Sequence, residues 1–458
     1  MASDDELAEL LARALDAVET LAVARTGRVS AGSPGRAARR VAETDLSRAR
    51  TPRHAISGLT RLLTESGVRT NHRRHFGWMN PRPHPAAAVA DLLVSFANPQ
   101  LATRALSPGP VEVERRLVSE LAARMGLGER AGGSFTGGGS EANATALVCA
   151  LVRGVPGFAE GGLAGAKPPV VYLSEEGHDS VEKLARAHGL GRRHVRWLPT
   201  DARRLSVPAL ARAIDEDRAA DRAPTLVVST AGTTNFGAID PLAEVAALCA
   251  EQKIWHHVDA AWGGMAALSA RTRPLLAGVE LADSVSLDPH KGLGAPLGTG
   301  VFLVRDAAVL EEAFDVQNDY GPGSSAPDPF ARSLAWSRRF VGARLWLPLL
   351  QEGWPGLAAR VERMFALTAP LRHEVERAGF TLLGPEATLP VVCFRDPDRA
   401  DDAQGAIARF VEQSGEAWIA RTRVDGRPAL RACVCSHDTD PSDVEALGAL
   451  LARARRES

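Results

Sequence analysis

The sequence predicts an α/β fold with a mostly parallel sheet, and two observations support this prediction. Short continuous apolar runs, typical of buried parallel strands, occur at 170–174, 225–230, 254–258 and 301–304. A helical pattern at 241–249 separates the second run from the third, which gives a strand–helix–strand unit. Because ligands bind beyond the carboxyl ends of the strands in such sheets, we expect a functional site at that edge.

The N-terminal segment opens with a predicted amphipathic helix. Its apolar residues recur at helical spacing: Leu7, Leu10, Leu11, Ala14, Val18 and Leu21. Residues 26–53 have the Arg-, Gly-, Ser- and Pro-rich composition of a linker, so the apolar face of the helix needs another surface to cover it. We therefore predict that residues 1–85 form a helical segment that contacts a partner subunit.

The rest of the chain divides into two predicted domains. Residues 86–345 contain the apolar strand pattern and form the large domain. Residues 346–458 combine helical patterns with strand candidates at 391–394 and 429–434, and end in a helix that Asp440 can cap. This second region predicts a smaller α+β domain at the C-terminus.

Composition excludes several functional classes. The chain has 54 Lys plus Arg against 55 Asp plus Glu, so no net field attracts nucleic acid or an anionic membrane. The acidic start of the chain is unlike a secretory signal, and no apolar stretch is long enough to span a membrane. The five cysteines are scattered, which favours reduced thiols in a cytoplasm. Cys433 and Cys435 have one residue between them, a spacing that predicts no metal site.

Three further features point together to one cofactor. Lys291 follows the apolar segment 284–287, Asp259 ends the run 254–258, and a glycine-rich turn at 137–139 precedes a helix. Each feature alone has an ordinary reading, as a surface lysine, a loop-bonded carboxylate or a simple turn. Pyridoxal phosphate requires an amine to form a Schiff base, a carboxylate near its ring nitrogen and a helix N-terminus for its phosphate. The combination predicts a pyridoxal phosphate site.

The position of Asp259 strengthens this prediction. An isolated ionised carboxylate among apolar residues is costly unless it is paired, and a pyridinium N–H is a natural partner. At contact distance such a pair is worth on the order of 4 kcal/mol with an effective dielectric constant of about 20. A nucleotide-binding alternative lacks support, because no strand is followed by a dinucleotide glycine fingerprint and no phosphate loop ending in Gly-Lys-Ser/Thr occurs.

From about residue 70 to its end, the chain resembles the pyridoxal phosphate-dependent group II amino acid decarboxylases. This family includes the aromatic amino acid, glutamate and 2,4-diaminobutyrate decarboxylases. Six motifs occur in one order: Ser107-Pro108 followed by Glu112 and Glu114, then 135–143, 174–180, 232–234, 258–261 and 288–291. The resemblance implies fold type I, with a mostly parallel seven-stranded sheet in the large domain and a smaller α+β C-terminal domain. It also implies a cytoplasmic homodimer with shared active sites.

The resemblance assigns the cofactor-binding residues. Lys291 would form the Schiff base, Asp259 would face the ring nitrogen, Ala261 would pack beneath the ring and His178 would stack on its opposite face. Gly139 and Ser140 would hold the phosphate. Thr234 would border the cofactor, and His290 would bind near the phosphate or the substrate. Outside its motif, His178 would be read as a structural histidine.

Two residues would act on the substrate. Arg431 matches the family arginine that meets the α-carboxylate, although it is otherwise one of many arginines. Tyr320, beside the Pro/Gly/Ser-rich stretch 321–327, resembles the mobile-loop tyrosine that returns a proton to the α-carbon after carbon dioxide leaves. The resemblance therefore implies decarboxylation to the amine.

The chain departs from the family pattern at two places. Asp288 stands where the aromatic and glutamate branches usually carry Asn, and an added carboxylate changes the electrostatics of the site. The substrate-pocket motif is altered at 74–81. His75 and Trp78 in this segment are candidate substrate-binding residues, but they could equally belong to the core. The identity of the substrate stays open.

Three alternatives remain open at this point. The same cofactor could serve decarboxylative oxidative deamination, transamination or carbon–carbon bond cleavage. The chain could also be a catalytically silent binding subunit. A zinc hydrolase that uses His256, His257 and Asp259 is disfavoured, because adjacent residues on a strand point to opposite faces.

Overall fold

A computed structural model describes residues 4–24, 27–31, 34–65, 67–316, 327–385 and 389–457. They form two compact units. The larger unit comprises residues 83–366 and 384–391, and the smaller unit comprises 1–82, 367–383 and 392–458. Within these described ranges, no helix combines the length and the apolar character needed to cross a membrane.

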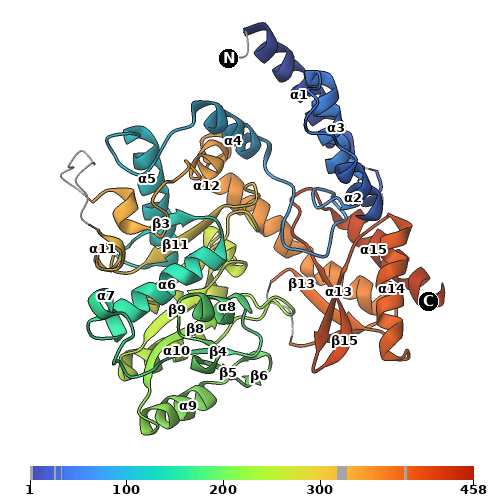
Figure 1. The fold of residues 1–458 in the computed structure, drawn as a ribbon. Helices are drawn as coiled ribbons and strands as arrows, with labels where there is room; N and C mark the ends of the chain where they lie inside the picture. Colours follow the sequence, from blue (N-terminus) through green and yellow to red (C-terminus); the bar gives the residue numbers. More distant parts are fainter. Residues whose placement is uncertain are drawn as a thin grey trace. The chain divides into compact units, whose positions relative to one another are not determined.

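The larger unit is built on a seven-stranded sheet with strand order β3-β11-β10-β9-β8-β4-β5 (Figure 1). The strands are β3 (Gly132–Thr136), β4 (Pro169–Ser174), β5 (Val195–Leu198), β8 (Ala223–Thr230), β9 (Trp255–Asp259), β10 (Ser284–Leu287) and β11 (Gly300–Val304). The pairs from β10 to β5 are parallel, whereas β11 pairs antiparallel with both β10 and β3. The predicted α/β class and mostly parallel seven-stranded sheet are confirmed.

Helices cover both faces of this sheet. Val171 and Leu173 of β4 pack with α6 (Gly139–Gly154) and α8 (Ser180–Ala187). Their neighbours Val170 and Tyr172 point the other way and pack with α9 (Val207–Ala219) and α10 (Leu242–Gln252). Because alternate residues of one strand are buried on opposite faces, the strand sequence is a continuous apolar run, as expected for a covered parallel sheet.

The remaining helices of the larger unit flank the sheet. They are α4 (Pro85–Ala97), α5 (Pro108–Met125), α7 (Phe158–Gly161), α11 (Ala308–Phe314) and α12 (Ala343–Ala366). Ala90 and Val94 of α4 pack against Ala343 of α12. This contact joins α12 to the larger unit, whose first segment runs to residue 366, while the domain bound at 345 stays a prediction.

The smaller unit combines a four-stranded sheet with N- and C-terminal helices. Strand order is β12-β13-β15-β14, with β12 (Thr381–Leu383), β13 (Val391–Arg395), β14 (Ala420–Val424) and β15 (Arg427–Cys433). Its helices are α1 (Asp4–Ala24), α2 (Pro34–Ala42), α3 (Pro52–Glu65), α13 (Thr368–Arg377), α14 (Asp401–Ser414) and α15 (Pro441–Glu457). Short strand pairs complete the described elements: β1 (Ser30–Ala31) with β2 (Gly67–Val68), and, in the larger unit, β6 (Thr200–Asp201) with β7 (Arg204–Leu205).

Two details of the smaller unit compare directly with the sequence prediction. Asp440 Oδ1 accepts hydrogen bonds from the backbone N–H groups of Ser442 and Asp443 at 2.9 and 3.2 Å, so the predicted cap of the last helix is confirmed. The stretch 26–53, expected to be a linker, contains α2 instead. Residues 1–82 share one compact unit with the C-terminal residues, while their predicted contact with a partner subunit stays a prediction.

Candidate active site

Asp259 ends β9 at the carboxyl edge of the sheet and is buried. Asn143 Nδ2 donates to Asp259 Oδ2 at 2.7 Å. Ser286 Oγ and the Ala261 N–H each donate to Oδ1 at 3.1 Å. Burial would raise the pKa of Asp259, but the charge of Lys291 and the hydrogen bond from Asn143 more than offset it, so the pKa lies below its usual value. The carboxylate is therefore ionised in a buried site.

A chain of hydrogen bonds reaches Asp259 through the sheet. Trp255 Nε1 donates to Ser284 Oγ at 2.8 Å, and Ser284 Oγ lies 2.9 Å from His257 Nδ1. His257 Nε2 lies 3.0 Å from Asn143 Oδ1. Because the Asn143 amide points its N–H toward Asp259, His257 Nε2 must carry the proton and Nδ1 must accept from Ser284. Each hydrogen bond of this series then has its donor on the side away from Asp259 and its acceptor on the side toward it.

Burial keeps the histidines of β9 neutral. It lowers the pKa of His257 to about 4 and that of its neighbour His256 to about 3. His256 Nε2 lies 2.8 Å from Ser229 Oγ, a partner different from those of His257. Among the described residues, no group of three or more His, Cys, Asp or Glu side chains has a metal-binding arrangement. The zinc hydrolase reading gains no support from this geometry.

Lys291 lies on the turn that follows β10. Its Nζ is 3.1 Å from Asp288 Oδ2, and His290 Nε2 is 3.6 Å from the same oxygen. His290 Nδ1 lies 2.8 Å from the Thr299 carbonyl oxygen, which fixes the imidazole in the turn. Lys291 is the most exposed of the three side chains and also acts electrostatically on Asp259. The turn thus places one amine beside the Asp288 carboxylate and within electrostatic range of Asp259.

The N-terminus of α6 approaches the same turn. Gly138 has φ 148° and ψ 177°, a conformation that favours glycine, and it caps the helix that begins at Gly139. A Cβ atom placed on Gly139 would lie 3.1 Å from both Ala261 Cβ and Asp288 Oδ2. The first N–H groups of a helix lack partners inside it, so those of Gly139 and Ser140 are available to an anion.

The other predicted cofactor-binding residues also follow the carboxyl ends of strands. His178 follows β4 and is exposed, and its Nδ1 accepts from the Ser180 N–H at 3.1 Å. Thr234 follows β8 and is exposed, as is Ser140 on the first turn of α6. The structure brings Asp259, Ala261 and Ser286 into contact and places His290 and Lys291 beside Asp288. The cofactor-binding roles of all these residues, and of His178, Thr234 and Ser140, stay predictions.

The predicted substrate-binding residues meet in the smaller unit. Arg431 Nη2 donates to the Gly77 carbonyl oxygen at 2.6 Å, and Arg431 is buried. The His75 ring stacks on Trp418 with a centroid distance of 5.1 Å and an interplanar angle of 2°. Trp78 is 62% exposed, so it is not a core residue of this unit. The altered segment 74–81 is therefore held beside the strand that carries Arg431.

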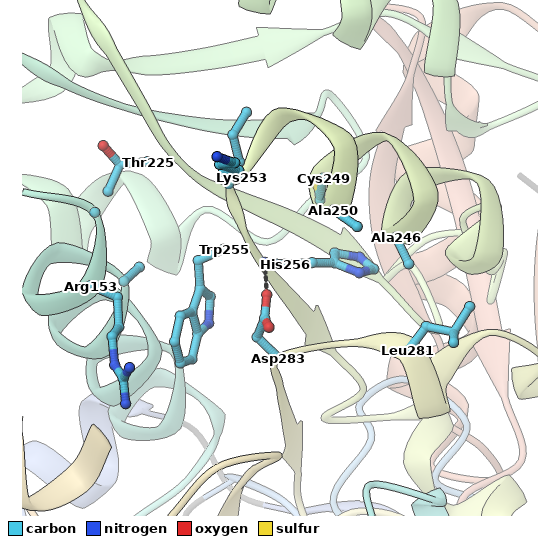
Figure 2. A pocket seen from close by; sticks show the side chains of 13 residues that line it. Arg153, Thr225, Ala246, Cys249, Ala250, Lys253, Trp255, His256, Leu281 and Asp283 are labelled. Atoms are coloured by element: carbon cyan, nitrogen blue, oxygen red, sulfur yellow. Dashed lines mark hydrogen bonds between the residues drawn. The ribbon is translucent and has the colours of Figure 1, made fainter. Parts of the chain in front are cut away.

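A cavity lies at the opposite, amino ends of the strands. It has a volume of about 260 Å³ and is lined by Thr225 of β8, Trp255 and His256 of β9, and Asp283 just before β10 (Figure 2). Figure 2 shows the Asp283 carboxylate, which accepts from the His256 backbone N–H at 2.8 Å. Because Asp259 lies at the other end of β9, this cavity is separate from the candidate active site.

Comparison with known proteins identifies the family. A family model described as "Pyridoxal-dependent decarboxylase conserved domain" matches residues 34–396. The chain belongs to the pyridoxal-dependent decarboxylases. This decarboxylase is 33% identical over 373 residues to bovine acidic amino acid decarboxylase GADL1, covering 78% of the chain and 70% of the relative. It is 33% identical over 381 residues to L-2,4-diaminobutyrate decarboxylase of Rhizobium meliloti, covering 81% and 75% respectively.

Solved structures agree with this assignment. The crystal structure of mouse CSAD superposes on the decarboxylase with a TM-score of 0.93 and 27% identity, over 99% of both chains. The rice TDC structure solved with PLP and tryptamine gives a TM-score of 0.92 and 25% identity, over 99% of this chain and 98% of that one. The predicted fold type, enzyme class and cofactor are confirmed: the protein is a pyridoxal phosphate-dependent amino acid decarboxylase.

The residues of the decarboxylase fit this cofactor. Asp259 supplies a buried ionised carboxylate, and Lys291 supplies an amine within its electrostatic reach. A Cβ atom on Gly139 would crowd Ala261 and Asp288 at the helix N-terminus. One buried polar atom in this cluster, Asp288 Oδ1, has no hydrogen-bond partner among the described residues. Tyr320 lies outside the described residues, so its predicted role stays a prediction.

From the sequence alone, Asn143 and Ser286 of the decarboxylase have no assigned role, and His257 is named only as a ligand in the disfavoured zinc hydrolase alternative. Asn143 is the last residue of the motif at 135–143. It lies four positions after Gly139 and hence on the same face of α6. Ser286 pairs with Asp259 in the parallel register of β10 and β9, a relationship that only the sheet reveals. The alternation of His257 with Asp259 along one strand face was the available signal for its involvement.

Proposed function

We propose that the protein converts an L-amino acid to the corresponding amine and carbon dioxide, with Lys291 as the cofactor-binding amine and Asp259 as the partner of the ring nitrogen. The observation that carries this assignment is the buried, ionised Asp259, whose pKa is lowered partly by the charge of Lys291. When bound, pyridoxal phosphate supplies an electron sink for the bond that breaks at the α-carbon.

The side chains around Asp259 have a defined task in this proposal. Asn143, Ser286 and the Ala261 N–H all donate to its carboxylate, so they hold it as an acceptor in fixed orientation. An acceptor of full negative charge at this point keeps a proton on the group that faces it. The neutral His257 donates to the Asn143 oxygen and so supports the amide orientation that points its N–H toward Asp259.

Arg431 is proposed to bind the substrate α-carboxylate. Its guanidinium is buried and one of its nitrogens is anchored to the Gly77 carbonyl, which limits its rotation. An anchored guanidinium holds a carboxylate in one orientation, and orientation decides which bond at the α-carbon is broken. His75 and Trp78 stay proposed substrate-side residues because they flank the same carbonyl in sequence.

Tyr320 is proposed to return a proton to the α-carbon. This role favours the amine as product over the aldehyde or keto acid of the alternative reactions. Carbon dioxide, hydrogen peroxide and keto acid should be measured in parallel with each substrate. Carbon dioxide and amine in equal amounts, without peroxide, would support the proposal, whereas stoichiometric peroxide or keto acid would replace it with oxidative deamination or transamination.

The substrate can be found by a direct screen. The twenty common amino acids should be tested for carbon dioxide release together with diaminobutyrate, ornithine and cysteine sulfinate, since relatives are named for acidic amino acids and for diaminobutyrate. Purified protein should also be examined for visible cofactor absorption. Absence of this absorption, together with no turnover of any substrate, would favour the catalytically silent alternative.

We further propose that the protein works as a homodimer. Val89, Leu92, Leu93 and Phe96 form an exposed apolar stripe along α4, on the side away from its contact with α12. Their spacing follows a helical face, and a second copy of the chain is the proposed cover. Leu93→Glu should give monomers by light scattering, while Leu281→Glu, at an exposed leucine elsewhere, should not. The cytoplasmic location stays a prediction.

A further inference from the structure

Asp288 is a buried carboxylate without a full set of partners. Its side chain is 3% exposed. Oδ2 lies 3.1 Å from Lys291 Nζ and 3.6 Å from His290 Nε2. Oδ1 is buried and has no hydrogen-bond partner among the described residues. A buried acceptor without a hydrogen bond destabilises the folded protein. Packing alone therefore does not explain why an aspartate stands at position 288.

The same carboxylate faces the first residue of α6. A Cβ placed on Gly139 would lie 3.1 Å from Asp288 Oδ2 and 3.5 Å from Oδ1. In the proposed function, Gly139 and Ser140 hold the cofactor phosphate. An ionised carboxylate has acceptors only, and so do the ionised oxygens of a phosphate, so the two groups cannot hydrogen-bond and their charges repel.

We propose that Asp288 opposes the phosphate of the cofactor and thereby sets how tightly the protein holds it. This inference rests on the proposed phosphate site at Gly139 and Ser140. Lys291 offsets the charge of Asp288 only in part, because the same amine also acts electrostatically on Asp259. Once Lys291 is bonded to the cofactor, it no longer serves Asp288 as a free ammonium group.

The test uses ligands that do not react with Lys291. Pyridoxamine 5′-phosphate and pyridoxamine differ by the phosphate group, and their affinities for the full chain, stripped of cofactor, can be measured by fluorescence titration. Asp288→Asn should bind pyridoxamine 5′-phosphate about tenfold more tightly than wild type, since removal of one like charge at close range is worth at least that factor. Its affinity for pyridoxamine should not change.

Two further variants make the result decisive. Asp288→Ala should also tighten binding of pyridoxamine 5′-phosphate, because it removes the charge without adding a donor. Asp283→Asn removes the same charge at the opposite end of β10, in the wall of the cavity at the amino ends of the strands (Figure 2). This variant should change the affinity for neither pyridoxamine 5′-phosphate nor pyridoxamine. An unchanged affinity in both Asp288 variants would overturn the proposal.

Weaker binding in Asp288→Ala would also overturn it, because the carboxyl group would then be a protonated donor to the phosphate. Ser140→Ala separates this failure from a failure of the proposed phosphate site. Ser140→Ala should weaken the binding of pyridoxamine 5′-phosphate and leave the binding of pyridoxamine unchanged. If Ser140→Ala changes neither affinity, the phosphate lies elsewhere and the proposed site, rather than the electrostatic argument, is at fault.

Discussion

Asn143 and Asp259 are joined by a hydrogen bond of 2.7 Å although they lie on different elements, α6 and β9. Both side chains are buried. The bond links the helix that carries the proposed phosphate site to the carboxylate proposed for the ring nitrogen. One side chain thus connects the two ends of the proposed cofactor site.

Asn143→Ala should therefore impair cofactor function without destroying the fold. A hydrogen bond to a charged group contributes about 1.5–3 kcal/mol, so kcat/KM should fall by about ten- to a hundredfold. Asn143→Asp should be worse, because it places a second carboxylate beside Asp259. Steady-state kinetics with a saturating supply of cofactor would check both, and a normal kcat/KM in Asn143→Ala would contradict the assignment of Asn143.

His257→Phe should change the pH dependence of stability. Burial lowers the pKa of His257 to about 4, while an unfolded histidine has a pKa of 6.5. As pH falls below 6.5, His257 takes up a proton in the unfolded chain but stays neutral in the folded chain. The folded state therefore loses stability until about pH 4. Wild type should lose up to about 1.4 kcal/mol per pH unit through this residue.

The measurement is urea unfolding of the two proteins between pH 7.5 and 4.5. At pH 7.5 the variant should be less stable, because the buried Asn143 oxygen loses its donor at a cost of about 1–3 kcal/mol. The difference between their free energies of unfolding should become smaller as pH falls, since only wild type carries the buried imidazole. Parallel curves for the two proteins would show that His257 takes up its proton equally in both states.

Much of the fold could be predicted from sequence, and the reasons are local. The apolar runs that became β4, β8, β9 and β11 are buried on both faces, which leaves a continuous signal. Strand β3 (Gly132–Thr136) was not predicted because its two glycines interrupt the apolar run that marks the other strands. Glycine is required at position 133 because a side chain there would collide with the backbone of Phe302. The direction of β11 also could not be read from composition.

The candidate site was predictable where chemistry demands a residue type. Lys291, Asp259 and the glycine turn each serve a requirement of the cofactor, so their types and order were informative. The supporting residues were not, because Ser286 and Asn143 reach Asp259 only through strand register and helix placement. Asp288 was noticed as an unusual residue, but only the structure places its carboxylate against Gly139.

Lys291→Ala should abolish both visible cofactor absorption and turnover. The variant should also leave the Asp288 carboxylate without the cation that lies 3.1 Å away, so the protein stripped of cofactor should be less stable than wild type. Absorption spectra after reconstitution and a borohydride reduction followed by mass spectrometry would check the first expectation. A cofactor adduct that borohydride still fixes in the variant would show that another amine is used.

Tyr320→Phe should divert product from the amine toward the aldehyde, with dissolved oxygen as the oxidant and with ammonia and hydrogen peroxide released. The variant keeps the ring and removes only the hydroxyl group that the proposal uses as proton donor. Tyr172→Phe is the matched control, because Tyr172 is the one other tyrosine of the chain and its hydroxyl donates to Asp217 at 2.8 Å inside the larger unit. Equal amine yields for Tyr320→Phe and wild type would remove Tyr320 from the mechanism.

Arg431→Lys should weaken substrate binding while leaving the cofactor in place. A lysine keeps the charge but loses the fork of donors that can hold a carboxylate in two places while remaining anchored to the Gly77 carbonyl at 2.6 Å. We expect kcat/KM to fall by about a hundredfold, equivalent to about 2.7 kcal/mol, with unchanged cofactor absorption. Arg421→Lys, on the neighbouring strand β14 with an exposed side chain, should leave both unchanged. Equal losses in the two variants would show that the effect comes from the sheet rather than from a carboxylate held by Arg431.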